Sequence, residues 1–88
     1  MASYQIEWKS SARKELRKLP KDKVQKIVEA VDSLATNPRP TGCRKLVGSE
    51  QTWRIRVGSY RVIYNIFSSI LVIEVVRVAH RKNVYRNR

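Results

Sequence analysis

The chain has 88 residues, with 19 lysines and arginines against seven acidic residues and a formal net charge of +12. This excess of positive charge indicates a polyanionic partner, either a nucleic acid or an acidic protein. The single cysteine, Cys43, excludes an internal disulfide, and one cysteine plus one histidine are too few ligands for a structural zinc site. The single histidine, His80, excludes acid–base catalysis by a pair of histidines.

The length allows one small domain, which we take as residues 1–88. The N-terminal residues lack the apolar core of a signal peptide. The most apolar run, residues 70–73, is four residues long, whereas a membrane-spanning helix needs about 20. These features predict a soluble cytoplasmic protein that has no membrane partner.

The N-terminal third predicts a strand and two helices. Apolar residues alternate with polar ones from Tyr4 to Trp8, which is typical of a half-buried strand. Ser10 or Ser11 is then expected to cap a helix that ends before Pro20. Its apolar face consists of Ala12, Leu16 and Leu19.

The second helix has the clearest periodicity in the chain, and the prolines at 38 and 40 end it. Its apolar stripe consists of Val24, Ile27, Val28, Val31, Leu34 and Ala35. Residues 52–57, 60–67 and 70–79 then predict three antiparallel strands joined by turns at Gly58-Ser59 and Ser68-Ser69. The fold class is therefore α+β: an N-terminal strand, a two-helix hairpin and a three-strand meander form one sheet with the helices on one face.

A two-residue turn at Gly58-Ser59 sets the register of the first two meander strands. Trp53, Ile55 and Val57 then share the helix-covered face with Tyr64, Val62 and Tyr60. The second turn adds Leu71, Ile73 and Val75 to that face. The opposite face, which we call the arginine face, carries Arg54, Arg56 and Arg61, with Val72, Glu74 and Val76 from the last strand.

Arg56 lies opposite Arg61 in this register, and like charges placed opposite each other destabilise a sheet. One interpretation is that both side chains extend harmlessly into solvent. The other is a phosphate-binding site, since guanidinium groups bind phosphate in a bidentate manner and stay charged at neutral pH. Beyond the strand, Tyr85 is placed to stack on a base, and His80 is either an acid–base group or a hydrogen-bonded structural residue.

The segments WRIRVGSYRVIYNI and VRVAHRKNVYR, in that order and after the strand and helical hairpin, resemble the RelE/ParE toxin superfamily, in particular its RelE branch. The resemblance spans nearly the whole chain. It implies a RelE-like fold and a ribosome-dependent endoribonuclease that cuts mRNA in the ribosomal A site. The 2′-hydroxyl would attack the adjacent phosphate, with no metal or other cofactor, and translation would be inhibited.

Carried over residue by residue, the resemblance implies a catalytic set of Arg54, Arg56, Arg61, Arg81 and Tyr85. Further RNA contacts are expected from Arg44, Lys45, Lys82 and Arg86. Some members of the family have lysines where this chain has Arg54 and Arg56. Arginine effectively keeps its proton, so the general base is left to His80, to ribosomal RNA, or to no group at all if charge and positioning suffice.

The implied partners are an acidic cognate antitoxin, the ribosome with its mRNA, and operator DNA reached through the antitoxin. Two other functions fit the same chain. A ParE-like inhibitor of DNA gyrase on the same fold would not need the clustered arginines. A basic nucleic-acid-binding module without catalysis would show binding that weakens steeply with salt and no cleavage.

Overall fold

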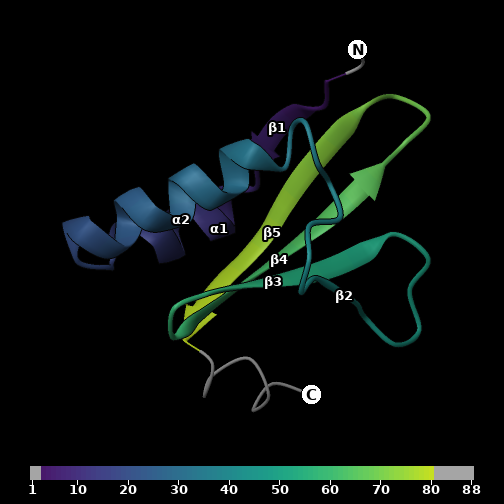
Figure 1. The fold of residues 1–88 in the computed structure, drawn as a ribbon. Coiled ribbons are helices and arrows are strands. Elements are labelled where there is room, and N and C mark those ends of the chain that lie inside the picture. The colour runs from purple at the N-terminus through teal and green to yellow at the C-terminus, as the bar shows by residue number, and fades with distance from the viewer. Residues whose placement is uncertain (1–2, 81–88) are drawn as a thin grey trace.

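The structure is a computed structural model, and it describes residues 3–80. Figure 1 shows the two helices together on one side of the sheet, as the predicted α+β class requires. In these residues the elements are β1 (Gln5–Trp8), α1 (Ser10–Arg17), α2 (Lys21–Ser33), β2 (Arg44–Lys45), β3 (Thr52–Val57), β4 (Tyr60–Phe67) and β5 (Val72–His80). Among the described residues, no helix has the length and apolarity needed to cross a membrane.

The strands form one mixed sheet in the order β1-β5-β4-β3-β2. β1 pairs in parallel with β5, so the first strand of the chain lies beside the last, and the other pairs are antiparallel. The short strand β2 was not predicted. Its two residues pair with Arg54 and Trp53, which is too short a contact to leave a periodic pattern in the sequence.

The predicted register of β3 and β4 is confirmed. Val57 lies opposite Tyr60, Ile55 opposite Val62, and Trp53 opposite Tyr64. The turn between them places Gly58 at a φ of 61°, a conformation that a residue without a β-carbon adopts at little cost. One face of both strands therefore packs under the helices, and the other carries the arginines.

The predicted position of β5 needs two corrections. The turn before it spans residues 68–71, so Leu71 lies in the turn with a φ of 56° and 40% exposure, not on the helix-covered face. β5 also contains a bulge, since Tyr64 pairs with Val75 whereas its neighbour Ile63 pairs with Arg77. Val76 is the extra residue and has no partner in the ladder, so the predicted alternation ends there.

The predicted serine cap of α1 is wrong. Lys9 occupies the N-cap position in an extended conformation and makes no side-chain capping hydrogen bond, while Ser10 is already helical. The amide of Lys9 instead donates to the carbonyl oxygen of Val75, 3.0 Å away, which ties the start of α1 to β5. The sheet therefore sets where this helix begins.

The core lies between the helices and the sheet. The predicted apolar stripe of α2 faces inward, because Ile27, Val31 and Leu34 are fully buried. Ala12 of α1 is also fully buried, and Leu16 packs at the edge of the same cluster. These contacts hold the helices on one face of the sheet, so that the arginine face is the one the helices do not cover (Figure 1).

Tyr64 is the largest fully buried side chain in the described residues. Its hydroxyl donates a 2.7 Å hydrogen bond to the carbonyl oxygen of Pro38, in the loop after α2. Burial, assisted by the neighbouring Cys43 thiol, raises the pKa of Tyr64 well above its ordinary value near 10. The folded protein therefore favours the neutral phenol.

Replacing Tyr64 with phenylalanine is expected to lower the free energy of unfolding by about 1 kcal/mol at pH 8, because the Pro38 carbonyl loses its donor. Since the folded-state pKa is raised, the parent is fully stabilised below pH 10 and loses stability as the pH rises from there toward the folded pKa. That loss is about 1.4 kcal/mol per pH unit and is absent from Tyr64→Phe. Urea titrations of both proteins at pH 8, 10 and 11 measure the difference, and a pH-independent difference would contradict the assignment.

Candidate functional site

The three predicted strand arginines lie on the arginine face, opposite the helices. Arg56 of β3 pairs with Arg61 of β4, and Arg54 pairs with Ile63, one step along the ladder. Their exposure differs: Arg61 is 6% exposed and Arg54 9%, whereas Arg56 is exposed to solvent. The structure thus brings Arg54, Arg56 and Arg61 together on two adjacent strands.

Burying arginines here would be costly for stability without compensating partners. Removing a charged group from water has a penalty of several kcal/mol before its partners compensate for it. Arg56 and Arg61 also face each other as like charges. The interpretation that both side chains extend harmlessly into solvent does not fit Arg61, because this residue is almost fully buried. A site that binds an anion gives a reason for keeping these residues.

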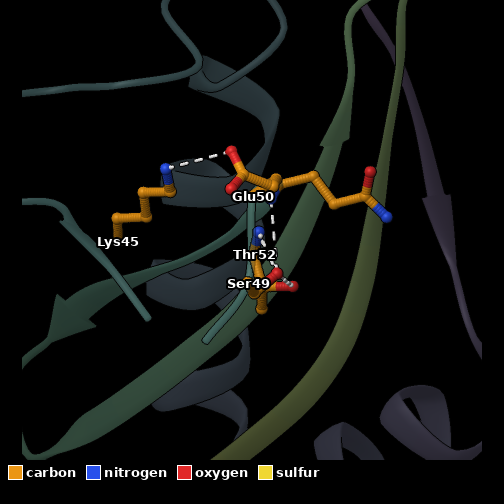
Figure 2. A network of polar contacts seen from close by, with 5 residues as sticks. Lys45, Ser49, Glu50 and Thr52 are labelled. Atoms are coloured by element: carbon orange, nitrogen blue, oxygen red, sulfur yellow. Dashed lines mark hydrogen bonds and ion pairs between the residues drawn. The ribbon is translucent and has the colours of Figure 1, made fainter. Parts of the chain in front are cut away.

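A polar row, which sequence reasoning did not single out, crosses the same face beside the arginines. Thr52, Asn65 and Glu74 occupy neighbouring positions on β3, β4 and β5. The Thr52 hydroxyl donates to Asn65 Oδ1 at 2.6 Å, and Asn65 Nδ2 donates to Glu74 Oε1 at 3.2 Å. At the start of the row the Ser49 hydroxyl donates to Thr52 Oγ1 at 2.7 Å, as Figure 2 shows. The signal in the sequence was one amide residue, Asn65, among the apolar and aromatic residues 62–67 of β4.

The two basic residues of β2, Arg44 and Lys45, lie on opposite faces of the sheet, although both were predicted as RNA contacts. Arg44 pairs with Arg54 and therefore belongs to the arginine face, whereas Lys45 pairs with Trp53 of the opposite face. Lys45 Nζ lies 3.7 Å from Glu50 Oε1, an exposed ion pair that Figure 2 shows from close by. Of the two predicted RNA contacts, Arg44 alone shares a face with the catalytic candidates.

His80 lies on the other side of the sheet from the arginines. The bulge in β5 places Ala79 opposite Arg61 and His80 opposite Tyr60. The His80 and Tyr60 rings meet edge to face, with centroids 5.5 Å apart and an interplanar angle of 84°. This position favours a structural role for His80 over an acid–base role at the arginines.

The end of β5 is held by Glu15 of α1, a contact that the sequence did not reveal. β1 ends at Trp8, so the last residues of β5 extend beyond their parallel neighbour. Glu15 Oε1 accepts a 2.7 Å hydrogen bond from the Val78 amide, and Glu15 Oε2 accepts one from Arg77 Nε at 3.2 Å. Four predicted residues that follow this strand, Arg81, Lys82, Tyr85 and Arg86, lie outside the described residues.

The chemistry available on the arginine face is the binding of negative charge. Guanidinium groups donate hydrogen bonds and effectively never lose their proton, so Arg54, Arg56 and Arg61 are unsuited to abstracting a proton. Between residues 3 and 80, no three His, Cys, Asp or Glu side chains gather as a metal site would require. Two or more guanidinium groups on one phosphate would stabilise charge that develops there during a reaction.

Comparisons with known proteins agree with this fold. The profile of the family described as the ParE toxin of a type II toxin–antitoxin system, parDE, matches residues 6–85. The toxin RelG of Mycobacterium tuberculosis is 33% identical over 87 residues, covering 94% of this chain and 97% of RelG.

Two solved structures are also similar. A chain of the archaeal RelE–RelB complex from Pyrococcus horikoshii is 29% identical, with a TM-score of 0.82 and coverage of 92% of this chain and 98% of that one. A chain of the toxin–antitoxin complex RelBE2 from M. tuberculosis is 28% identical, with a TM-score of 0.80 and coverage of 91% and 100%. The chain belongs to the RelE/ParE superfamily of toxins from type II toxin–antitoxin systems.

Proposed function

We propose that this toxin is a ribosome-dependent endoribonuclease that cuts mRNA in the ribosomal A site. The observation that carries the proposal is the set of Arg54, Arg56 and Arg61 on one face of the sheet, the face opposite the helices (Figure 1). The resemblance to RelE-type toxins supplies the substrate and the reaction.

In the proposed reaction the ribose 2′-oxygen attacks the adjacent phosphorus and the bond to the 5′-oxygen breaks. The products are a 2′,3′-cyclic phosphate and a free 5′-hydroxyl. Arg56 and Arg61 stabilise the extra negative charge on the phosphorane. The 2′-hydroxyl proton passes to the ribosome or to water, since His80 lies on the other face and arginine does not accept it. Arg81 is assigned to stabilising the charge on the leaving 5′-oxygen, which takes its proton from water, and Tyr85 to stacking on a base.

The proposed partner of the free toxin is an acidic cognate antitoxin. Related chains are known from RelE–RelB and RelBE2 complexes. A net charge of +12 favours an acidic segment that folds on binding and covers the arginine face. Operator DNA would be reached through that antitoxin.

Primer extension on a translated mRNA after toxin induction tests the activity. We expect cuts within the coding region, and none in a matched mRNA whose start codon is removed so that ribosomes do not translate it.

The family profile is described for ParE, and a ParE-like gyrase inhibitor is the second candidate. Intact mRNA together with DNA damage after induction would support that candidate and reject the nuclease.

A further inference from the structure

A cavity of about 570 Å³ lies between α2 and the outer edge of β3, at the border of the arginine face. Its lining includes Ala30, Ser33, Gly42, Arg44, Ile55 and Arg56. Two structural features leave this space open. In the part of the chain that the structure describes, β2 pairs with β3 only at Trp53 and Arg54, and α2 presents the small residues Ala30 and Ser33 here.

The lining combines an apolar wall with positive charge. Ile55 is 7% exposed and belongs to the hydrophobic core. The charged residues among the described lining are Arg44 and Arg56, and both are exposed. Arg56 also lies opposite Arg61 in the ladder, so the cavity and the arginine face share this residue. A ligand held by Arg56 can therefore extend from one to the other.

We propose that this cavity binds the nucleotide next to the scissile phosphate in the RNA, with its phosphate between Arg44 and Arg56 and its ribose or base against Ile55. The proposal rests on the proposed function, because it takes RNA as the substrate. Binding sites for small molecules commonly have volumes of roughly 300–1,000 Å³, a range that includes this cavity. Sites for single-stranded nucleic acid combine a positive groove with surfaces for the bases.

Arg44 and Lys45 provide a matched pair of variants for the test. They are adjacent on β2 and carry the same charge, but Arg44 lines the cavity whereas Lys45 is paired with Glu50 on the other side of the strand. Arg44→Ala and Lys45→Ala thus remove the same net charge from neighbouring positions. A third variant, Ser33→Leu, fills the cavity from α2 and leaves both arginines in place.

The probe is a fluorescein-labelled RNA trinucleotide with 2′-O-methyl groups, which lacks the attacking hydroxyl. Its affinity is measured by fluorescence anisotropy over a series of salt concentrations. Arg44→Ala is expected to weaken binding about tenfold, the loss of one charge-assisted hydrogen bond, and to lower the slope of log affinity against log salt by about 0.7. Ser33→Leu should weaken binding without changing the slope. Lys45→Ala should change both the affinity and the slope by less than Arg44→Ala does.

Three outcomes would overturn the proposal: equal effects of Arg44→Ala and Lys45→Ala, no effect of Ser33→Leu, or no binding of the probe by the parent. An acidic peptide, hexaglutamate, serves as a competitor. If hexaglutamate displaces the RNA probe, and Arg44→Ala weakens the binding of hexaglutamate as much as it weakens the binding of RNA, the cavity would be assigned to a protein partner instead. Failure of the proposed function has a different result: mRNA stays intact after induction. The binding measurements can still be interpreted in that case, because they do not depend on cleavage.

Discussion

Replacing Arg61 with alanine is expected to slow mRNA cleavage by about 10²–10³-fold, the range typical for removing one group that stabilises a developing anion. Arg61 is the most buried of the three arginines on the arginine face, and its register places it opposite Arg56. Electrostatic stabilisation is stronger at a site shielded from water. Arg61→Ala should therefore cost more activity than Arg56→Ala, whose side chain is exposed.

The measurement is the cleavage rate of ribosome-bound mRNA by primer extension, with the purified variants at equal concentration. Lys23→Ala, an exposed position on α2, removes the same charge far from the arginine face and should leave the rate unchanged. Arg61→Lys keeps the charge but loses the planar pair of donors, so its rate should fall between those of the parent and Arg61→Ala. An Arg61→Ala protein that folds normally and cleaves as fast as the parent would remove Arg61 from the catalytic set.

The arginine face could be predicted because its register depends on local chemistry. Gly58 permits a two-residue turn, and that turn determines which residues of β3 and β4 lie opposite each other. The apolar stripe of α2 could also be predicted, since one face of a helix buries residues such as Ile27 and Val31 at a regular spacing. Both features follow from residues that are close in sequence.

The bulge in β5 could not be predicted, and it changes the position of His80. Val75 and Val76 are both apolar, so an extra residue at this point leaves no interruption in the alternation of the sequence. An unbroken strand would have placed His80 on the arginine face, beside the catalytic candidates. The bulge instead places it against Tyr60. A single inserted residue therefore decides which side of the sheet holds the imidazole.

The contact of Glu15 with β5 escaped prediction for a different reason. A carboxylate on the exposed side of a short basic helix resembles ordinary surface charge, and its partners Arg77 and Val78 are more than 60 positions away. The reason for this contact becomes clear only when the order of the strands in the sheet is known. β1 ends before β5 does, so the Val78 amide requires an acceptor that no strand supplies.

Replacing Glu15 with alanine is expected to lower the free energy of unfolding by about 1–3 kcal/mol. The Val78 amide would lose its 2.7 Å acceptor at a position where the residue is 3% exposed, and Arg77 would lose its ion pair. Glu15→Gln keeps a side-chain oxygen that can accept from the amide, and the lost ion pair is partly exposed to solvent, so this variant should lose much less stability.

Urea denaturation followed by circular dichroism measures these differences. Glu29→Ala, at an exposed position on α2, removes the same charge from a helix and should change stability by only a few tenths of a kcal/mol. Amide hydrogen exchange adds a local test, because the Val78 amide should exchange faster in Glu15→Ala than in Glu15→Gln beyond what the change in global stability explains. If alanine and glutamine at position 15 lower stability equally, the charge and not the hydrogen bond to β5 is what Glu15 contributes. The end of β5 would then be held by its pairing with β4, and the strand that precedes Arg81 would not need a helix to fix it.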